Sequence, residues 1–191
     1  MAKKELIEIR WHGRGGQGAK SAAQFLAEAA LDEGKYIQAF PEYGPERAGA
    51  PIRSYTRISG QPIKIHSGVE NPEAVVVIDP TLATAAVLEG LGKDSFVVIN
   101  TPDSPAEIRK KLNYQEGKLA TVDATQISLE ETGIPMPNTP MLGALLKVFP
   151  IVSLEGLEKK VSAKFVKKIG QEKTQANIEA IRRAHAEVKI G

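Results

Sequence analysis

A glycine-rich stretch near the start of the chain holds the residue types best suited to binding a charged group. Gly13, Gly15 and Gly18 match the pattern G-x-G-x-x-G, directly after an apolar segment and directly before a run of small residues. Glycines at this spacing allow a tight turn and leave backbone N–H groups at a helix start, where phosphates bind. The stretch therefore indicates either a nucleotide site or a strand-to-helix turn that needs glycine for geometry alone.

These glycines are compatible with two kinds of nucleotide site, a dinucleotide site and a P-loop. A dinucleotide site also needs an acidic residue at the end of the second strand, where this chain has Glu42 beside a proline-rich loop. The sequence GRGGQGAKS at residues 13–21 differs from a P-loop by one inserted alanine, and residues 75–79 imitate the strand that supplies a magnesium-binding acid. The insertion turns Lys20 by about 100° around the helix, away from a phosphate. Glycine spacing alone leaves all three interpretations open.

The other residues that could do acid–base or metal chemistry are scattered. His12, His66 and His185 lie in unlike sequence contexts, so we expect surface or packing roles for them; His12, next to the glycines, is the least ordinary of the three. Asp79 ends an apolar segment and precedes a proline, which favours a helix cap over a metal ligand. We therefore predict no catalytic residue and no metal ligand in this chain.

A second segment of interest follows the predicted second strand. Residues 41–51 contain three prolines and two glycines, which indicates an ordered loop. Aromatic residues and arginines of the kind enriched at protein interfaces lie in and around it, and a stiff loop loses little entropy on docking. We expect an interface here rather than a self-packed turn with surface ion pairs such as one from Glu46. The predicted interface residues are Phe40, Glu42, Tyr43, Arg47 and Arg53.

These residues must be positioned by an alternation of strands and helices. Apolar runs predict strands at 6–11, 36–40, 52–58, 62–65, 74–78, 96–99 and 119–122, and helical spacing predicts helices at 19–30, 81–88, 105–112, 140–148 and 153–188. Ser59-Gly60 separates two of the strands by a hairpin signal. The fold class predicted is α/β: a mostly parallel, doubly wound, Rossmann-like sheet with an antiparallel hairpin and a helical C-terminal segment. We expect one domain over residues 1–191, with 153–191 packed on it as a helical extension.

Composition narrows the function classes. The formal net charge is +2 over 191 residues, which gives no drive toward nucleic acid or an anionic membrane. The chain has no cysteine, so disulfides, thiolate metal sites and iron–sulfur ligation are excluded from it. Because no apolar run approaches the roughly 20 residues of a membrane span, we expect a cytoplasmic protein.

Four stretches of the sequence together resemble one family. They are residues 9–21 (IRWHGRGGQGAKS), 39–51 (AFPEYGPERAGAP), 75–79 (VVVID) and 138–144 (NTPMLGA). With them, the chain resembles the gamma subunit of pyruvate (2-oxoacid):ferredoxin oxidoreductase. The resemblance implies a complex with alpha, beta and delta subunits that converts pyruvate and coenzyme A to acetyl-CoA and CO2 and reduces ferredoxin.

The resemblance also implies which cofactors the complex uses. They are thiamine diphosphate with magnesium, iron–sulfur clusters and coenzyme A, and we expect none to be bound by this chain alone. The chain lacks both cysteine and a Gly-Asp-Gly motif for magnesium thiamine diphosphate, which agrees with a noncatalytic subunit. Arg14, Gly15, Gly16, Gln17 and Gly18 then become a candidate coenzyme A or interface loop. The alternative is a stand-alone nucleotide-binding protein, a Rossmann dehydrogenase or an atypical P-loop NTPase, that uses the same loop.

Overall fold

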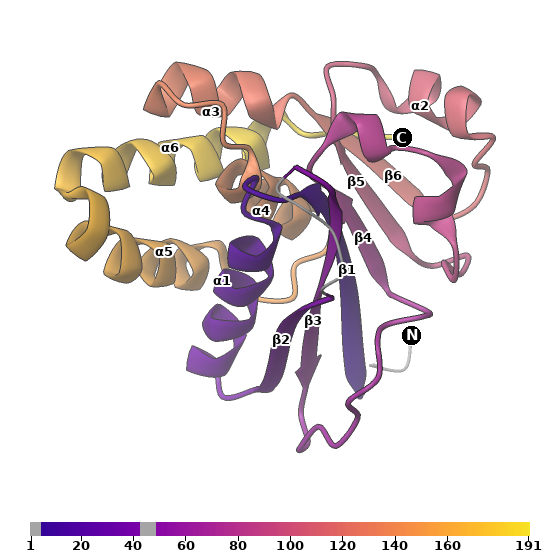
Figure 1. The fold of residues 1–191 in the computed structure, drawn as a ribbon, viewed down its shortest axis with the longest axis horizontal. Helices are drawn as coiled ribbons and strands as arrows, with labels where there is room; N and C mark the ends of the chain where they lie inside the picture. The colour runs from indigo at the N-terminus through magenta and orange to yellow at the C-terminus, as the bar shows by residue number, and fades with distance from the viewer. Residues whose placement is uncertain (1–4, 43–48) are drawn as a thin grey trace.

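A seven-stranded sheet forms the centre of the molecule, and the computed structural model describes residues 5–42 and 49–191 of the chain. The strands follow the order β2-β3-β1-β4-β5-β6-β7 (Figure 1). Their bounds are β1 Leu6–Arg14, β2 Tyr36–Glu42, β3 Pro51–Ser59, β4 Ala74–Val77, β5 Phe96–Asn100, β6 Lys118–Val122 and β7 Lys189–Ile190. The four central strands β1, β4, β5 and β6 are parallel, while β2, β3 and β7 pair antiparallel at the two edges.

Helical elements cover both faces of this sheet (Figure 1). The larger cluster of apolar side chains joins one face to α1 Ala19–Asp32, α3 Ala124–Thr132, α4 Asn138–Val148, α5 Leu154–Ile169 and α6 Gln171–Glu187. The smaller cluster joins the other face to α2 Pro105–Leu112 and the 3-10 turns η1 Pro80–Leu82 and η2 Ala85–Leu88. Strands that are buried on both faces read as continuous apolar runs, as those of β4 and β5 do. The predicted α/β class is confirmed.

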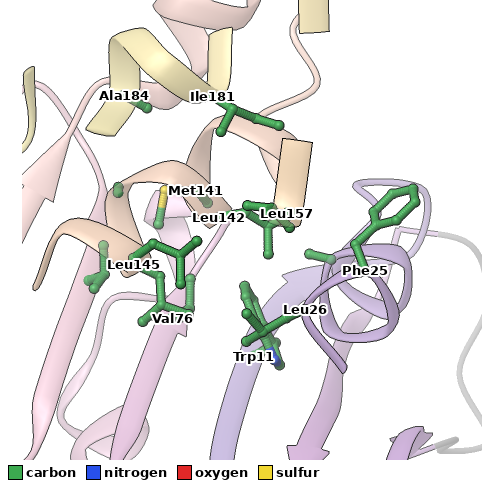
Figure 2. Packing of buried hydrophobic residues seen from close by; sticks show 14 of the residues in the cluster. Trp11, Phe25, Leu26, Val76, Met141, Leu142, Leu145, Leu157, Ile181 and Ala184 are labelled. Atoms are coloured by element: carbon green, nitrogen blue, oxygen red, sulfur yellow. The ribbon is translucent and has the colours of Figure 1, made fainter. Parts of the chain in front are cut away.

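The main core lies between β1, α1 and the C-terminal helices. Trp11 and Leu26 come together there with Leu157 (Figure 2), and all three side chains are fully buried. The indole Nε1 of Trp11 donates to Thr56 Oγ1 at 3.0 Å, and that hydroxyl donates to the Ala23 carbonyl at 2.9 Å. This relay satisfies the buried polar atoms of the core and ties α1 to β1 and β3.

The C-terminal helical segment is two helices rather than one. Gly170 separates α5 from α6 with a φ of 82°, a conformation that glycine adopts without a steric penalty. At the start of α5, Ser153 caps the helix by accepting from the Gly156 N–H at 3.0 Å. The predicted helical character of 153–188 is confirmed. Of the described helices, none combines the length and apolar character needed to cross a bilayer.

The predicted hairpin at Ser59-Gly60 is wrong, because residues 62–65 form no strand. The antiparallel part of the sheet instead comes from β3, which pairs with β2 on one side and β1 on the other. The physical reason is the guanidinium of Arg57, which binds the backbone of this segment. It donates to the carbonyls of Ile65, Ser67 and Gly68 at 2.8 to 3.4 Å, which holds the end of this segment to β3 without a strand pairing.

The predicted helix at 81–88 is also wrong, since two 3-10 turns replace it. As with Arg57, a buried arginine explains the difference, here Arg10. Its Nη2 donates to the Val87 carbonyl at 3.1 Å and to the Glu89 carbonyl at 2.6 Å, and Nη1 reaches the carbonyls of Val69 and Glu70 at 3.5 and 3.4 Å. Two buried arginines on one face of the sheet therefore each fasten an irregular segment to it.

Two elements of the fold were not predicted. Helix α3 begins after Asp123, whose side chain accepts from the Gln126 N–H at 3.0 Å. Strand β7 pairs with β6 through Lys189 and Ile190 and covers that edge of the sheet.

Candidate functional site

The glycine-rich stretch forms the connection from β1 to α1 at the carboxyl end of the parallel strands. Gly16 and Gly18 have φ angles of 97° and 79°, and Gly18 is the N-cap residue of α1. A Cβ atom on Gly18 would lie 2.5 Å from the side-chain nitrogen of Asn138 at the start of α4. Turn geometry and the close approach of α4 thus require glycine here, whatever the loop binds.

The loop uses part of its backbone internally. The Gly15 N–H donates to the Ala50 carbonyl at 3.0 Å, and the Gln17 N–H donates to the Arg14 carbonyl at 3.1 Å. Within residues 5–42 and 49–191, no protein acceptor faces the N–H groups of Gly16 and Gly18. Of the four backbone N–H groups of residues 15–18, those of Gly16 and Gly18 are therefore the two available to an anion in the described structure.

Arg14 and Gln17 join the loop to the end of β4 through Asp79. Gln17 Nε2 donates to Asp79 Oδ2 at 2.5 Å, Arg14 Nε lies 3.4 Å from the same oxygen, and Arg14 Nη2 donates to Thr81 Oγ1 at 2.9 Å. Burial alone would raise the pKa of Asp79, but the hydrogen bonds from Thr81 and Gln17 and the charge of Arg14 bring it below the usual value.

Asp79 accepts from the Thr81 N–H at 2.9 Å and so caps η1, as predicted. Its carboxylate oxygens are already occupied by protein donors. In the part of the chain that the structure describes, no three or more His, Asp or Glu side chains are grouped to hold a metal ion.

The described members of the predicted interface lie together on the antiparallel half of the sheet. Glu42 on β2 is opposite Arg53 on β3, and Arg53 is opposite His12 on β1. Phe40 packs on Tyr55 with ring centroids 5.2 Å apart, and the hydroxyl of Tyr55 donates to Glu42. Tyr43 and Arg47 lie outside the described residues.

The three histidines have different surroundings. His12 is only 6% exposed and its Nε2 accepts from Arg10 Nε at 3.0 Å, while His66 is exposed and His185 is half-buried. Burial, reinforced by the charges of Arg10 and Arg53, lowers the pKa of His12 to about 3. His12 is therefore neutral at physiological pH.

Two pockets lie at opposite ends of the sheet. A pocket of about 430 Å³ lies beside the glycine loop and includes His12, Arg53 and Thr81 in its walls. A larger one of about 1180 Å³ lies at the amino ends of the parallel strands, where Ile7 and Phe96 line it. No sequence motif indicated either. Because open α/β sheets bind ligands at the carboxyl ends of their strands, the glycine loop and the smaller pocket form the candidate site.

Comparison with known proteins identifies the family. Residues 8–187 match the family model described as pyruvate ferredoxin/flavodoxin oxidoreductase. The chain belongs to this family. The oxidoreductase family resemblance expected from the glycine loop and its surroundings is thereby confirmed.

Relatives in the oxidoreductase family match over nearly their whole length. The chain is 54% identical to the pyruvate synthase subunit PorC of Thermotoga maritima, over 97% of this chain and 96% of that protein. It is 48% identical to the pyruvate/ketoisovalerate oxidoreductases common subunit gamma of Pyrococcus abyssi, over 92% and 95% of the two chains. The crystal structure of the pyruvate oxidoreductase subunit PORC of Thermotoga maritima superposes with a TM-score of 0.89 at 51% identity, over 98% and 99% of the two chains.

The stand-alone nucleotide-binding alternative is not supported. Asp79, the acid a P-loop enzyme would use for magnesium, is bonded to Gln17 and Thr81, and Glu42, the acid a dinucleotide site would use for ribose, accepts from Tyr55. The family match includes the glycine loop within residues 8–187.

Proposed function

We propose that the chain is the gamma subunit of a pyruvate (2-oxoacid):ferredoxin oxidoreductase that converts pyruvate and coenzyme A to acetyl-CoA and CO2 with reduction of ferredoxin. The observation that carries this proposal is the 54% identity to a pyruvate synthase subunit, which covers 97% of this chain and 96% of that one. Because the match covers both chains almost completely, it supports the same place in an assembly.

In this proposal the subunit is noncatalytic. Thiamine diphosphate supplies the electron sink for decarboxylation when it is bound, and it belongs with magnesium and the iron–sulfur clusters to the alpha, beta and delta partners. The absence of cysteine and of a thiamine diphosphate motif in this chain supports that division. The assembly acts in the cytoplasm.

The glycine loop supplies an anion contact at a junction with a partner. The free N–H groups of Gly16 and Gly18 at the start of α1, with the 35% exposed Arg14 side chain, suit the phosphates of coenzyme A. The Arg14→Ala variant should raise the KM for coenzyme A more than the KM for the 2-oxoacid, and Arg14→Lys should retain part of the effect. Steady-state kinetics of the complex test this, and equal changes in both KM values would contradict it.

The end of β2, the residues that follow it and the start of β3 provide the main contact with partners, through Phe40, Glu42, Tyr43, Arg47 and Arg53. The Arg47→Glu variant should weaken assembly, because a carboxylate would replace an interface cation. Size-exclusion chromatography of mixed purified subunits measures this, with Lys173→Glu on the exposed side of α6 as the control. Normal assembly of Arg47→Glu would refute the interface assignment. If the partners are fully active while this chain elutes apart from them, the subunit assignment itself fails.

A further inference from the structure

His12 carries a hydrogen-bond donor that the protein does not use. Arginine N–H groups only donate, so the 3.0 Å contact from Arg10 Nε means that Nε2 of His12 bears no proton. A neutral imidazole then has its proton on Nδ1. Within residues 5–42 and 49–191, no acceptor for this Nδ1–H is found; the residue is 6% exposed, and Nδ1 is not one of the buried polar atoms that lack a partner, so it reaches solvent.

The position of Arg10 fixes the tautomer of His12. Arg10 uses its other N–H groups on the carbonyls of Val69, Glu70, Val87 and Glu89, which hold the guanidinium in place. Because Arg10 cannot turn away, Nε2 stays an acceptor and Nδ1 stays a donor. A donor held in this way is preorganised for a ligand, since the protein has already met the cost of orienting it.

The ring of His12 forms part of the wall of the 430 Å³ pocket beside the glycine loop. Arg53 lines the same pocket from the neighbouring strand, directly opposite His12 in the β1–β3 register. Arg53 is exposed; in the described part of the chain its side chain hydrogen-bonds to Tyr55 and forms no ion pair with a carboxylate. An N–H donor in the pocket wall and an exposed guanidinium beside it, whose charge no carboxylate of the described residues neutralises through an ion pair, favour an acceptor group with negative charge.

The charge of the pocket selects among anions. Glu42 also lines it, so its walls carry one acidic and one basic side chain. A dianion such as phosphate would be repelled by Glu42 more strongly than a monoanion. A planar carboxylate offers two oxygens, one for an imidazole N–H and one for a guanidinium.

We propose that the pocket lined by His12 and Arg53 binds a carboxylate group, which accepts from His12 Nδ1–H and pairs with Arg53. Arg53 and Glu42 belong to the surface that the proposed function assigns to partner contact. The carboxylate is therefore either that of a small acid or that of an acidic side chain of a partner subunit. The binding itself depends only on residues of this chain.

Titration of the isolated, nitrogen-15-labelled full chain tests the proposal by NMR in a carboxylate-free buffer at pH 7. Sodium acetate should shift the ring nitrogen signals of His12 with a saturable curve. Acetamide, which has the same shape without the charge, should not, and inorganic phosphate should bind more weakly than acetate. The Arg53→Gln variant should weaken acetate binding by about tenfold or more, as expected for one charge-assisted contact. Lys93→Gln, at the pocket on the other end of the sheet, is the control.

Each result decides the proposal. Absence of a saturable shift, an equal response to acetamide, or unchanged acetate binding in Arg53→Gln would overturn it. Because Arg53 is exposed, this variant does not remove a core side chain.

Repeating the titration on the assembled complex distinguishes the two sources of the carboxylate, a small acid and a partner's acidic side chain. Loss of acetate binding there indicates a partner's acidic side chain in the pocket, and retention indicates a site for a small acid. If the chain does not assemble, the proposed function fails, while the titration on the chain alone still stands or falls on its own.

Discussion

Individual buried charges decide how this chain is held together. Arg10 and Arg57 lie inside the structure, and each places all of its N–H donors on acceptors that the chain supplies. Arg57 also pairs with Glu8, its Nε lying 2.7 Å from a carboxylate oxygen. Burying a charge is costly unless every donor finds a partner, and carbonyl groups of loops meet most of that need here.

The neutrality of His12 makes the stability of the protein depend on pH. The unfolded chain protonates this histidine near pH 6.5, whereas the folded chain does so only near pH 3. Between these values the unfolded state binds more protons, so the stability that is present in full above pH 6.5 is lost as the pH falls. The slope should reach at most about 1.4 kcal/mol per pH unit.

Urea unfolding of wild type and His12→Gln from pH 7.5 to pH 4 measures this effect. The free energy of unfolding of the wild type should fall more steeply than that of the variant, in which this proton is absent. Carboxylates such as Asp79 contribute to both curves and cancel in the difference. Parallel curves would show that His12 is not kept neutral by the fold.

At the scale of elements, α4 and α6 pack unusually closely at one glycine. A Cβ atom on Gly143 would lie 2.1 Å from the Ile181 carbonyl oxygen, which is backbone and has no rotamer to change. The Gly143→Ala variant should therefore push the two helices apart and destabilise the fold by about 1–3 kcal/mol or more. Thermal unfolding checks this against Gly60→Ala, where an added methyl group meets open space. Equal melting temperatures for the two variants would contradict it.

The two buried arginines should each control the order of a separate segment. Arg10→Met should increase amide hydrogen exchange at residues 85–90, whose carbonyls it binds, and leave 61–68 unchanged. Arg57→Met should do the reverse. Each variant serves as the control for the other in exchange measured by mass spectrometry. Loosening of both segments in either variant would indicate general destabilisation instead.

The sequence predicts an element correctly when the backbone hydrogen bonds of that element follow the regular pattern of a strand or helix. Strands β4, β5 and β6 bond to each other, and their apolar runs identified them. Helix α2 was predicted at 105–112, and it begins with a capping box between Ser104 and Glu107, which is a local signal. Residues 62–65 and 81–88 were misassigned; one carbonyl in each, of Ile65 and of Val87, bonds to an arginine side chain on a strand outside the segment. Local patterns carry no information about such partners.

At the scale of the whole molecule, the site was predicted in part. The glycine motif located the loop, four stretches together indicated the family, and Asp79 was correctly assigned as a cap. The pocket with His12 was not predicted, because the role of that histidine depends on Arg10, whose side chain is fixed by carbonyls of residues 69–89. The assignment of the glycine loop and of the interface residues stays a prediction.

The domain organisation also stays a prediction, and truncation tests it. Leu157, Val161 and Ile181 are fully buried in the main cluster, so removing residues 153–191 should abolish cooperative unfolding and expose apolar surface. Near-ultraviolet circular dichroism and binding of a hydrophobic dye measure both. Removing only 189–191, which takes away β7, is the control. A cooperative fold without residues 153–191 would show that these helices are an accessory.

The main core has a consequence for biosynthesis, because its two halves are made far apart in time. Trp11 and Leu26 are translated early. Leu157, which packs in the same cluster, is translated about 130 to 150 residues later. At 5–20 residues per second the ribosome needs roughly 7–30 s for that stretch. During this interval β3 and β4 can already pack against α1 and β1, but the side of α1 that α5 covers stays exposed until α5 is made. The nascent protein should therefore present an apolar surface that a chaperone at the ribosome could cover.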